Sequence, residues 1–146
     1  GIELGNASDT TLSRKEAGQM NIEGKQVLTS DNTVTVTNKR ITPRVWSAAS
    51  DATPDINSDD YDAVTITALA AAITDVNVTG TPTNFQKLIF RIKDNGTARA
   101  ITWGSDFEAK GVALPTTTTI SKVLTVGFIY DTVTSKRGCI ASVEEE

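Results

Sequence analysis

The stretch Thr81–Trp103, TPTNFQKLIFRIKDNGTARAITW, decides the fold class. Successive side chains of a strand point to opposite faces, and the apolar residues of this stretch alternate accordingly. One face of the first strand carries Leu88, Phe90 and Ile92, and the other carries Ile89, Arg91 and Lys93. The triplet Asp94-Asn95-Gly96 offers the positive φ angles of a tight turn. We therefore predict a hairpin in which Leu88–Lys93 pairs with Arg99–Trp103, and nothing in this stretch indicates an active site.

The same alternation predicts further strands on both sides of this hairpin. The expected strands are Ala63–Leu69, Ile73–Val78, Lys122–Tyr130 and Lys136–Val143. Short strands at this spacing, without a long helical pattern, are typical of a β-sandwich or a jelly roll. We therefore predict an all-β protein in which residues 45–146 form an antiparallel, jelly-roll-like β-sandwich head, with the hairpin at its centre.

Residues 1–44 have a different character from the rest of the chain. Met20 and Ile22 alternate with polar residues, and Thr33–Thr37 reads TVTVT, so both places are expected to be short strands. The segment holds few large apolar residues, while ordering a chain costs roughly 1–2 kcal/mol per residue. Identical copies around a shared axis would cover such a segment. Residues 1–44 are therefore predicted to be an extended β stem that oligomerises, and a homotrimer is the expected state.

Composition and charge argue against a nucleic-acid partner and against a membrane-spanning segment. Hydrophobic residues make up 38% of the chain, and 23 threonines, which favour the wet faces of strands, fill much of the remainder. The net charge is −4, so nucleic acid is not an expected partner, because phosphate binding needs a basic surface. The acid is concentrated: residues 46–86 carry six Asp and no Lys or Arg. No apolar run reaches the roughly 20 residues of a membrane span.

The residue types needed for common catalytic chemistry are scarce. The chain has no His, which removes the usual nucleophile–base triads and the commonest metal ligand. Neither a GxxxxGK[ST] phosphate loop nor a GxGxxG motif occurs. Cys139 is the single cysteine, so it forms no internal disulfide, and it is expected to be a buried thiol. We predict no enzymatic activity, no catalytic residues, no cofactor and no metal site.

Two groups of carboxylates leave alternatives open. Asp106 and Glu108, two residues apart, would share one face of a strand and could flank a glycosidic bond, although a solvated pair is the simpler interpretation. An acidic cluster could supply oxygen ligands for Ca²⁺, but the Gly and Glu of a helix–loop–helix calcium site are missing, and a solvated loop is simpler. The cluster consists of Asp51, Asp55, Asp59, Asp60 and Asp62.

Trp103 is the candidate for ligand binding. Its ring, next to Gly104, could stack on a sugar whose hydroxyls Asp106 and Glu108 would hold. These three residues are the candidate carbohydrate site, on loops at the end of the head. A core or inter-subunit position is the alternative for Trp103, because burying an aromatic ring contributes on the order of 1.5–3 kcal/mol.

Several segments resemble virion proteins of tailed bacteriophages. Residues 6–14, NASDTTLSR, with Ala17-Gly18 and Ile22-Glu23-Gly24, resemble a segment common in tail-fibre and other virion structural proteins. Residues 37–45, TNKRITPRV, resemble the junction that follows it. The second half resembles a C-terminal β module of such proteins at Gln86–Leu88, Arg91–Asp94, Gly96–Arg99, Ile101–Trp103 and Leu114–Thr118.

The resemblance implies a non-enzymatic protein of the virion surface, a fibre or spike tip that adheres to the host. Its implied partners are further copies of itself, other virion proteins and a host cell-surface glycan. A purely structural decoration, collar or head-fibre component without a ligand is the alternative, and a polysaccharide-degrading enzyme is a third possibility. In one place the chain departs from the pattern: Asn84-Phe85 stands where an Asp-Gly turn is expected. Phe85 is therefore expected to be exposed or to lie between subunits.

Overall fold

A computed structural model describes residues 12–16, 19–22, 25–26, 38 and 40–146. Every regular element in these residues is a strand and none is a helix, so the all-β prediction is confirmed for them. The same residues contain no helix that is long and apolar enough to cross a membrane. The chain divides into two compact units, Gly1–Ile41 and Thr42–Glu146; the sequence-based boundary lay after residue 44.

The first unit contains a small antiparallel sheet in the order β1-β2-β3. Its strands are β1 (Leu12–Glu16), β2 (Gln19–Ile22) and β3 (Lys25–Gln26). The alternation at Met20 and Ile22 therefore did indicate a strand. The expected strand at Thr33–Thr37 lies outside the described residues. The stem and its oligomerisation stay predictions.

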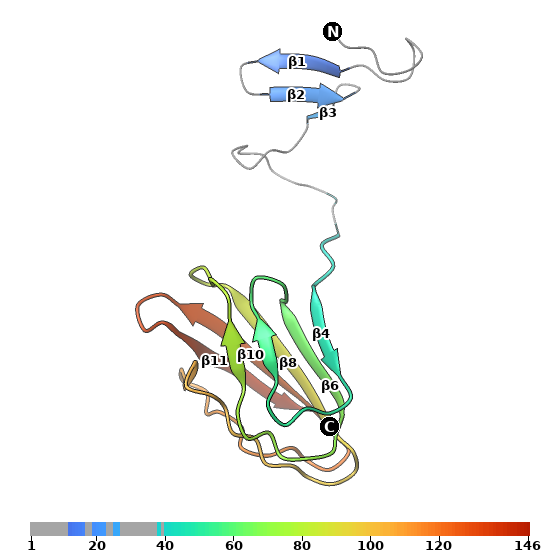
Figure 1. The fold of residues 1–146 in the computed structure, drawn as a ribbon, viewed down its shortest axis with the longest axis vertical. Helices are drawn as coiled ribbons and strands as arrows, with labels where there is room; N and C mark the ends of the chain where they lie inside the picture. The colour runs from blue at the N-terminus through green and yellow to red at the C-terminus, as the bar shows by residue number, and fades with distance from the viewer. Residues whose placement is uncertain (1–11, 17–18, 23–24, 27–37, 39) are drawn as a thin grey trace. The chain divides into compact units, whose positions relative to one another are not determined.

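The second unit, the head, is built on a mixed six-stranded sheet in the order β4-β6-β8-β10-β11-β9. Its strands are β4 (Val45–Ala48), β6 (Ala63–Leu69), β8 (Lys87–Asp94), β9 (Phe107–Ala109), β10 (Val123–Asp131) and β11 (Lys136–Glu144). Three neighbouring pairs are parallel, namely β4–β6, β6–β8 and β9–β11. Only β8–β10 and β10–β11 are antiparallel. Figure 1 shows β4, in cyan, at one edge of this sheet.

The prediction of a wholly antiparallel head with a central hairpin is wrong. Phe90 of β8 lies opposite Val64 of β6 on one side and Val126 of β10 on the other. β6 and β10, which both have a strong apolar alternation, therefore occupy the two edges of β8. The predicted return strand Arg99–Trp103 does not pair with β8. Gly96 does adopt a positive φ, of 94°, as expected. The predicted return strand Arg99–Trp103, however, forms only isolated bridges, at Ala100 and Ile101.

Three of the four other predicted strands are confirmed. Ala63–Leu69 is β6 with the predicted bounds, and the last two predicted strands match β10 and β11 to within one residue. The strand expected at Ile73–Val78 is shorter and later, at β7 (Asn77–Thr79), although Ile73 forms a bridge to Ile101.

One face of the large sheet is buried under a second, thinner layer. That layer contains the parallel pair of β5 (Asp55–Asn57) and β7, together with loops that pack on the sheet. Ile56 of β5 and Val78 of β7 point into the core, where they join side chains of the large sheet. The buried apolar members from the sheet are Val64, Ile66, Leu69, Leu88, Phe90, Ile92, Phe107, Leu124, Val126, Phe128 and Cys139. The burial of Cys139 is as predicted and raises the pKa of its thiol.

Candidate functional site: the open face of the large sheet

Trp103 lies against the core. Its ring centroid is 5.2 Å from that of Phe90, 5.1 Å from that of Phe107 and 5.0 Å from that of Phe128. The indole Nε1 donates a hydrogen bond of 2.8 Å to the carbonyl oxygen of Pro115. The ring is half-buried, and its contacts match the core position that sequence analysis gave as the alternative to a sugar platform.

Asp106 and Glu108 are held by different elements. The Asp106 carboxylate accepts a long hydrogen bond of 3.4 Å from the backbone N–H of Val78, in the second layer. Glu108 accepts one of 3.2 Å from the hydroxyl of Thr134, in the turn between β10 and β11. Strand β9 begins only at Phe107, so the alternation that would align the two carboxylates does not include Asp106.

The acidic cluster is engaged in local hydrogen bonds. Asp51 accepts from the N–H of Thr53, and Asp59 accepts from the N–H and hydroxyl of Thr81. Asp55 and Asp60 each accept from a neighbouring Asn side chain. Within the described part of the chain, no three His, Cys, Asp or Glu side chains gather closely enough to hold a metal ion.

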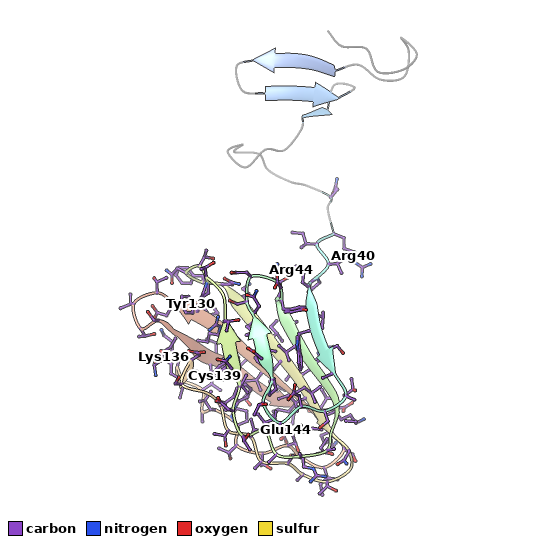
Figure 2. The ribbon with its side chains drawn as sticks, viewed as in Figure 1. Arg40, Arg44, Tyr130, Lys136, Cys139 and Glu144 are labelled. Carbon is purple, nitrogen blue, oxygen red and sulfur yellow. The ribbon has the colours of Figure 1, made fainter. Side chains whose placement is uncertain are left out.

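Asp62, the last member of the cluster, forms an ion pair with Arg44 at the start of the head (Figure 2). The guanidinium Nη2 and Nε lie 2.8 and 3.0 Å from the carboxylate oxygens, and the backbone N–H of Arg44 donates a third bond of 3.0 Å. The Arg44 side-chain hydrogen bonds lower the pKa of Asp62 to about 2. Arg44 also donates to the carbonyl oxygen of Asp59, so it fastens the chain to the β5–β6 loop just before β4 begins.

The face of the large sheet opposite the core is called here the open face. Its side chains are exposed or half-buried, whereas those of the other face are buried. Register places on it Val45, Ala63, Thr65, Lys87, Ile89, Arg91, Lys93, Val123, Thr125, Ile129 and Val143. Ile140 joins them at the bulge in β11, close to Gly127.

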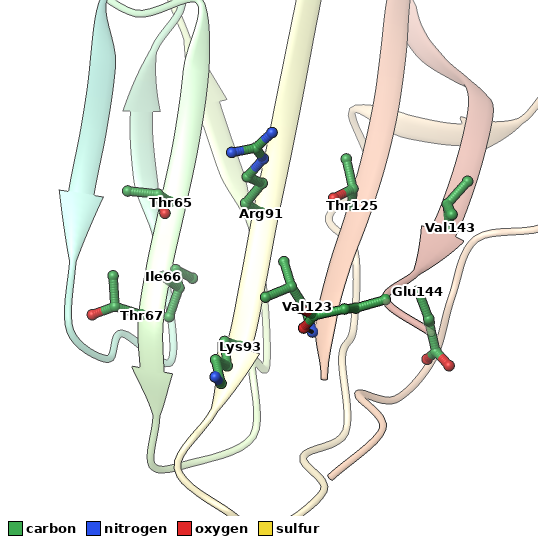
Figure 3. A pocket seen from close by; sticks show the side chains of 10 residues that line it. Thr65, Ile66, Thr67, Arg91, Lys93, Val123, Thr125, Val143 and Glu144 are labelled. Carbon is green, nitrogen blue, oxygen red and sulfur yellow. Dashed lines mark hydrogen bonds between the residues drawn. The ribbon is translucent and has the colours of Figure 1, made fainter. Parts of the chain in front are cut away.

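Two grooves run over the open face. The larger, of about 740 Å³, lies over the start of β6 and β8 and is lined by Val45, Phe85 and Ile89 among others. The smaller, of about 470 Å³, lies over β6, β8 and β10 and is lined by Thr65, Lys93 and Thr125 among others (Figure 3). Arg91 borders both grooves. The open face therefore carries a groove on each side of Arg91.

Phe85 stands at the margin of the larger groove in an unusual state. Its φ is +66°, in the left-handed region that bulky residues rarely adopt, and its ring is 73% exposed. Three surrounding hydrogen bonds hold this turn: Phe85 N–H to Tyr130, Gln86 N–H to Thr83, and Thr83 N–H to the Gln86 side chain. The expected exposure of Phe85 is confirmed.

The charges of the head are divided between its two sides. Lys87, Arg91 and Lys93 form a row along β8 on the open face, and none of them makes an ion pair with another described residue. The opposite side of the core is acidic. Exposed aspartates occupy the outer surface of the second layer and the loops beside it: Asp55, Asp59, Asp60 and Asp75.

Sequence reasoning identified the outward row of Ile89, Arg91 and Lys93 but gave it no function. The missed signal is that the outward side of β8 carries Ile89 between the cations Lys87 and Arg91, so an apolar side chain interrupts a charged row.

No protein-family model, curated protein or solved structure matches this chain. The function proposed below therefore rests on the geometry of the head and on the resemblance of residues 6–14 and 37–45.

Proposed function

We propose that this protein is a non-enzymatic surface component of a bacteriophage particle, a fibre or spike tip whose β head adheres to the host cell. The observation that carries the proposal is the position of the junction. Residues 37–45 resemble the segment that follows the stem in phage fibre proteins, and β4 begins at Val45, the last residue of that segment. The start of the first strand of the head at the end of this segment supports the proposal.

The junction is suited to transmit load between a particle and a head. Arg44, its penultimate residue, is tied to Asp62 by three hydrogen bonds, and the backbone N–H groups of Asp62 and Ala63 both donate to the Arg44 carbonyl oxygen. These contacts fix where the chain enters the large sheet. Force applied to the chain at this point would therefore be carried into the sheet by these contacts.

In this proposal residues 1–44 form an extended β stem that attaches to other virion proteins as a homotrimer. The head is a two-layered, sandwich-like β domain, and its ligand is a host cell-surface glycan. The glycan site is proposed at residues 104–110, which include the short edge strand β9 and in which Asp106 and Glu108 are half-exposed. Weak binding at each site would be raised by avidity in the assembled particle.

Antibodies raised against the purified full-length chain test the location. We expect them to label intact particles and the purified chain to reduce adsorption of particles to host cells. Particles that are labelled while adsorption is undiminished would support the structural decoration or collar alternative instead. A particle without label overturns the proposal, and release of reducing sugar from host polysaccharide, abolished by Asp106→Asn, would support the enzyme.

A further inference from the structure

We propose that the open face of the large sheet is a self-assembly surface, and that it docks on the acidic outer side of the second layer of another copy of the chain. This inference concerns how copies contact one another, so it holds wherever the protein is located. The apolar side chains, the sheet topology, the charges and Phe85 each contribute to it.

The apolar side chains and the topology show that the open face is suited to being covered. Val45, Ile89 and Ile140 are 49%, 43% and 47% exposed, and they lie on alternate strands of the sheet, with Ala63 of β6 and Gly127 of β10 between them. Parallel strands in proteins are normally covered on both faces, and β6 has a parallel neighbour on each side. A contiguous apolar face of this kind marks an interaction surface.

The charges identify a second copy as the occupant. The cations Lys87, Arg91 and Lys93 form no ion pair with a described residue, although Glu144 and Glu145 line the smaller groove and Asp62 lines the larger one. The second layer carries exposed acids, and residues 46–86 hold no Lys or Arg. The chain therefore supplies both halves of a complementary pair of surfaces. Charge complementarity of this kind fixes the register of an interface and rejects wrong arrangements.

The same charges decide how the copies meet. Two open faces packed against each other would bring one cationic row against another, and like charges in contact cost several kcal/mol. The favoured contact is therefore heterologous, with the open face of one copy on the acidic layer of the next. Heterologous contacts form a closed ring when the rotation between copies permits closure, which is the geometry that a homotrimer needs.

Phe85 supplies an anchor for this contact. Its exposed ring borders the groove of about 740 Å³, close to Val45 and Ile89. A left-handed φ in a phenylalanine is unfavourable, and a ring that stays in water gains nothing in return. Aromatic side chains are enriched among the residues that dominate binding energy at protein interfaces. The strained turn therefore presents the ring to the neighbouring copy.

Charge reversal in the full-length chain tests the contact. Arg91→Glu/Lys93→Glu reverses the open face, and Asp55→Lys/Asp60→Lys reverses the acidic layer. We expect each double variant to associate about 10- to 100-fold more weakly than the wild type in light scattering at micromolar concentration. The fourfold variant, which carries both reversals, should associate again to within a few-fold of the wild type.

Controls separate the interface from effects on folding or net charge. Thr97→Glu/Ala98→Glu adds two negative charges in the exposed turn after β8, at residues that line neither groove, and should leave the mass unchanged. Ile89→Glu changes an outward position without touching a charge pair, and should weaken association while melting close to the wild type. A monomeric wild type overturns the proposal, as does an unaffected mass in either double variant. A fourfold variant that melts normally but stays dissociated also overturns the pairing of these two surfaces.

Discussion

Arg44 and Asp62, 18 residues apart, are joined by a bidentate ion pair in which Nη2 lies 2.8 Å and Nε 3.0 Å from the two carboxylate oxygens. The pair closes the entrance to the head, because Arg44 immediately precedes β4 and Asp62 immediately precedes β6. Those two strands are parallel neighbours, with Val45 opposite Ala63. The ion pair therefore sets the register at the edge of the sheet.

Replacing Asp62 by Asn is expected to lower the melting temperature of the head near neutral pH and to have no effect at very low pH. The folded-state pKa of Asp62 is lowered from 3.8 to about 2, so the ionised form is favoured by folding. Its stabilisation is fully present above about pH 4 and is lost as the pH falls through the folded pKa near 2. Both side chains are about half-exposed, so solvent screening keeps the effect modest.

Thermal melting between pH 2 and pH 7 measures this difference. The melting curves of wild type and Asp62→Asn should converge as the pH approaches 2. Glu146→Gln, at an exposed carboxylate that forms no ion pair with a described residue and lines neither groove, is the control and should melt like the wild type throughout. A constant difference between wild type and Asp62→Asn across the whole range would contradict the assigned pKa.

Phe90→Ala is expected to reduce the free energy of unfolding by about 3–5 kcal/mol. The Phe90 ring is 1% exposed and makes edge-to-face contacts with Trp103, Phe107 and Phe128. Removing it leaves a cavity at the centre of the aromatic cluster. Urea denaturation gives the free energy, and Val133→Ala, at a side chain that is 91% exposed, is the control expected to change it far less. Equal losses in the two variants would show that the core is assigned wrongly.

The inward face of β8 was predictable because a period of two in Leu88, Phe90 and Ile92 is a local property of the sequence. The partners of β8 were not. The turn at Asp94–Gly96 favours a hairpin locally, but β6 and β10 offer longer apolar alternations that arrive from distant parts of the chain. Long-range pairing overrode the local signal, and the parallel connections followed from it.

In the candidate site, too, local features could be predicted from the sequence and long-range ones could not. The exposure of Phe85 and the core alternative for Trp103 could be read from single residues and their neighbours. The open face could not, because it exists only once Val45, Ile89 and Ile140 are aligned by the order β4-β6-β8-β10-β11. A sequence gives the outward residues of each strand, but the strand order decides which of them form one surface.

Asp94→Ala is expected to destabilise the end of the head where β8 ends. The buried Asp94 carboxylate accepts hydrogen bonds from the backbone N–H groups of Gly96 and Ser121 and from the hydroxyl of Thr118. These bonds, led by that from Ser121, lower the pKa of Asp94. Alanine leaves three donors without their acceptor, and the Thr118 hydroxyl is buried, where an unsatisfied donor is costly.

Hydrogen exchange locates that effect. We expect faster exchange at the amides of Gly96 and Ser121 in Asp94→Ala, together with a lower melting temperature. Asp94→Asn keeps one acceptor oxygen and should fall between the alanine variant and the wild type. Unchanged exchange at both amides in Asp94→Ala would contradict the anchoring role of the carboxylate.

Phe85→Gly separates the stability of the head from its assembly. Glycine adopts a φ of +66° freely, whereas an L side chain there costs roughly 1–2 kcal/mol. The greater entropy of glycine in the unfolded chain offsets roughly 0.5–1 kcal/mol of that gain. In the Arg91→Glu/Lys93→Glu background, which the proposed interface makes monomeric, Phe85→Gly should therefore melt at or slightly above its parent. In the wild-type background the same change should weaken association by about 10-fold or more, because the aromatic anchor is gone. A clear loss of stability in the monomeric background would mean that the ring packs on its own head, and unchanged association in the wild-type background would remove Phe85 from the interface.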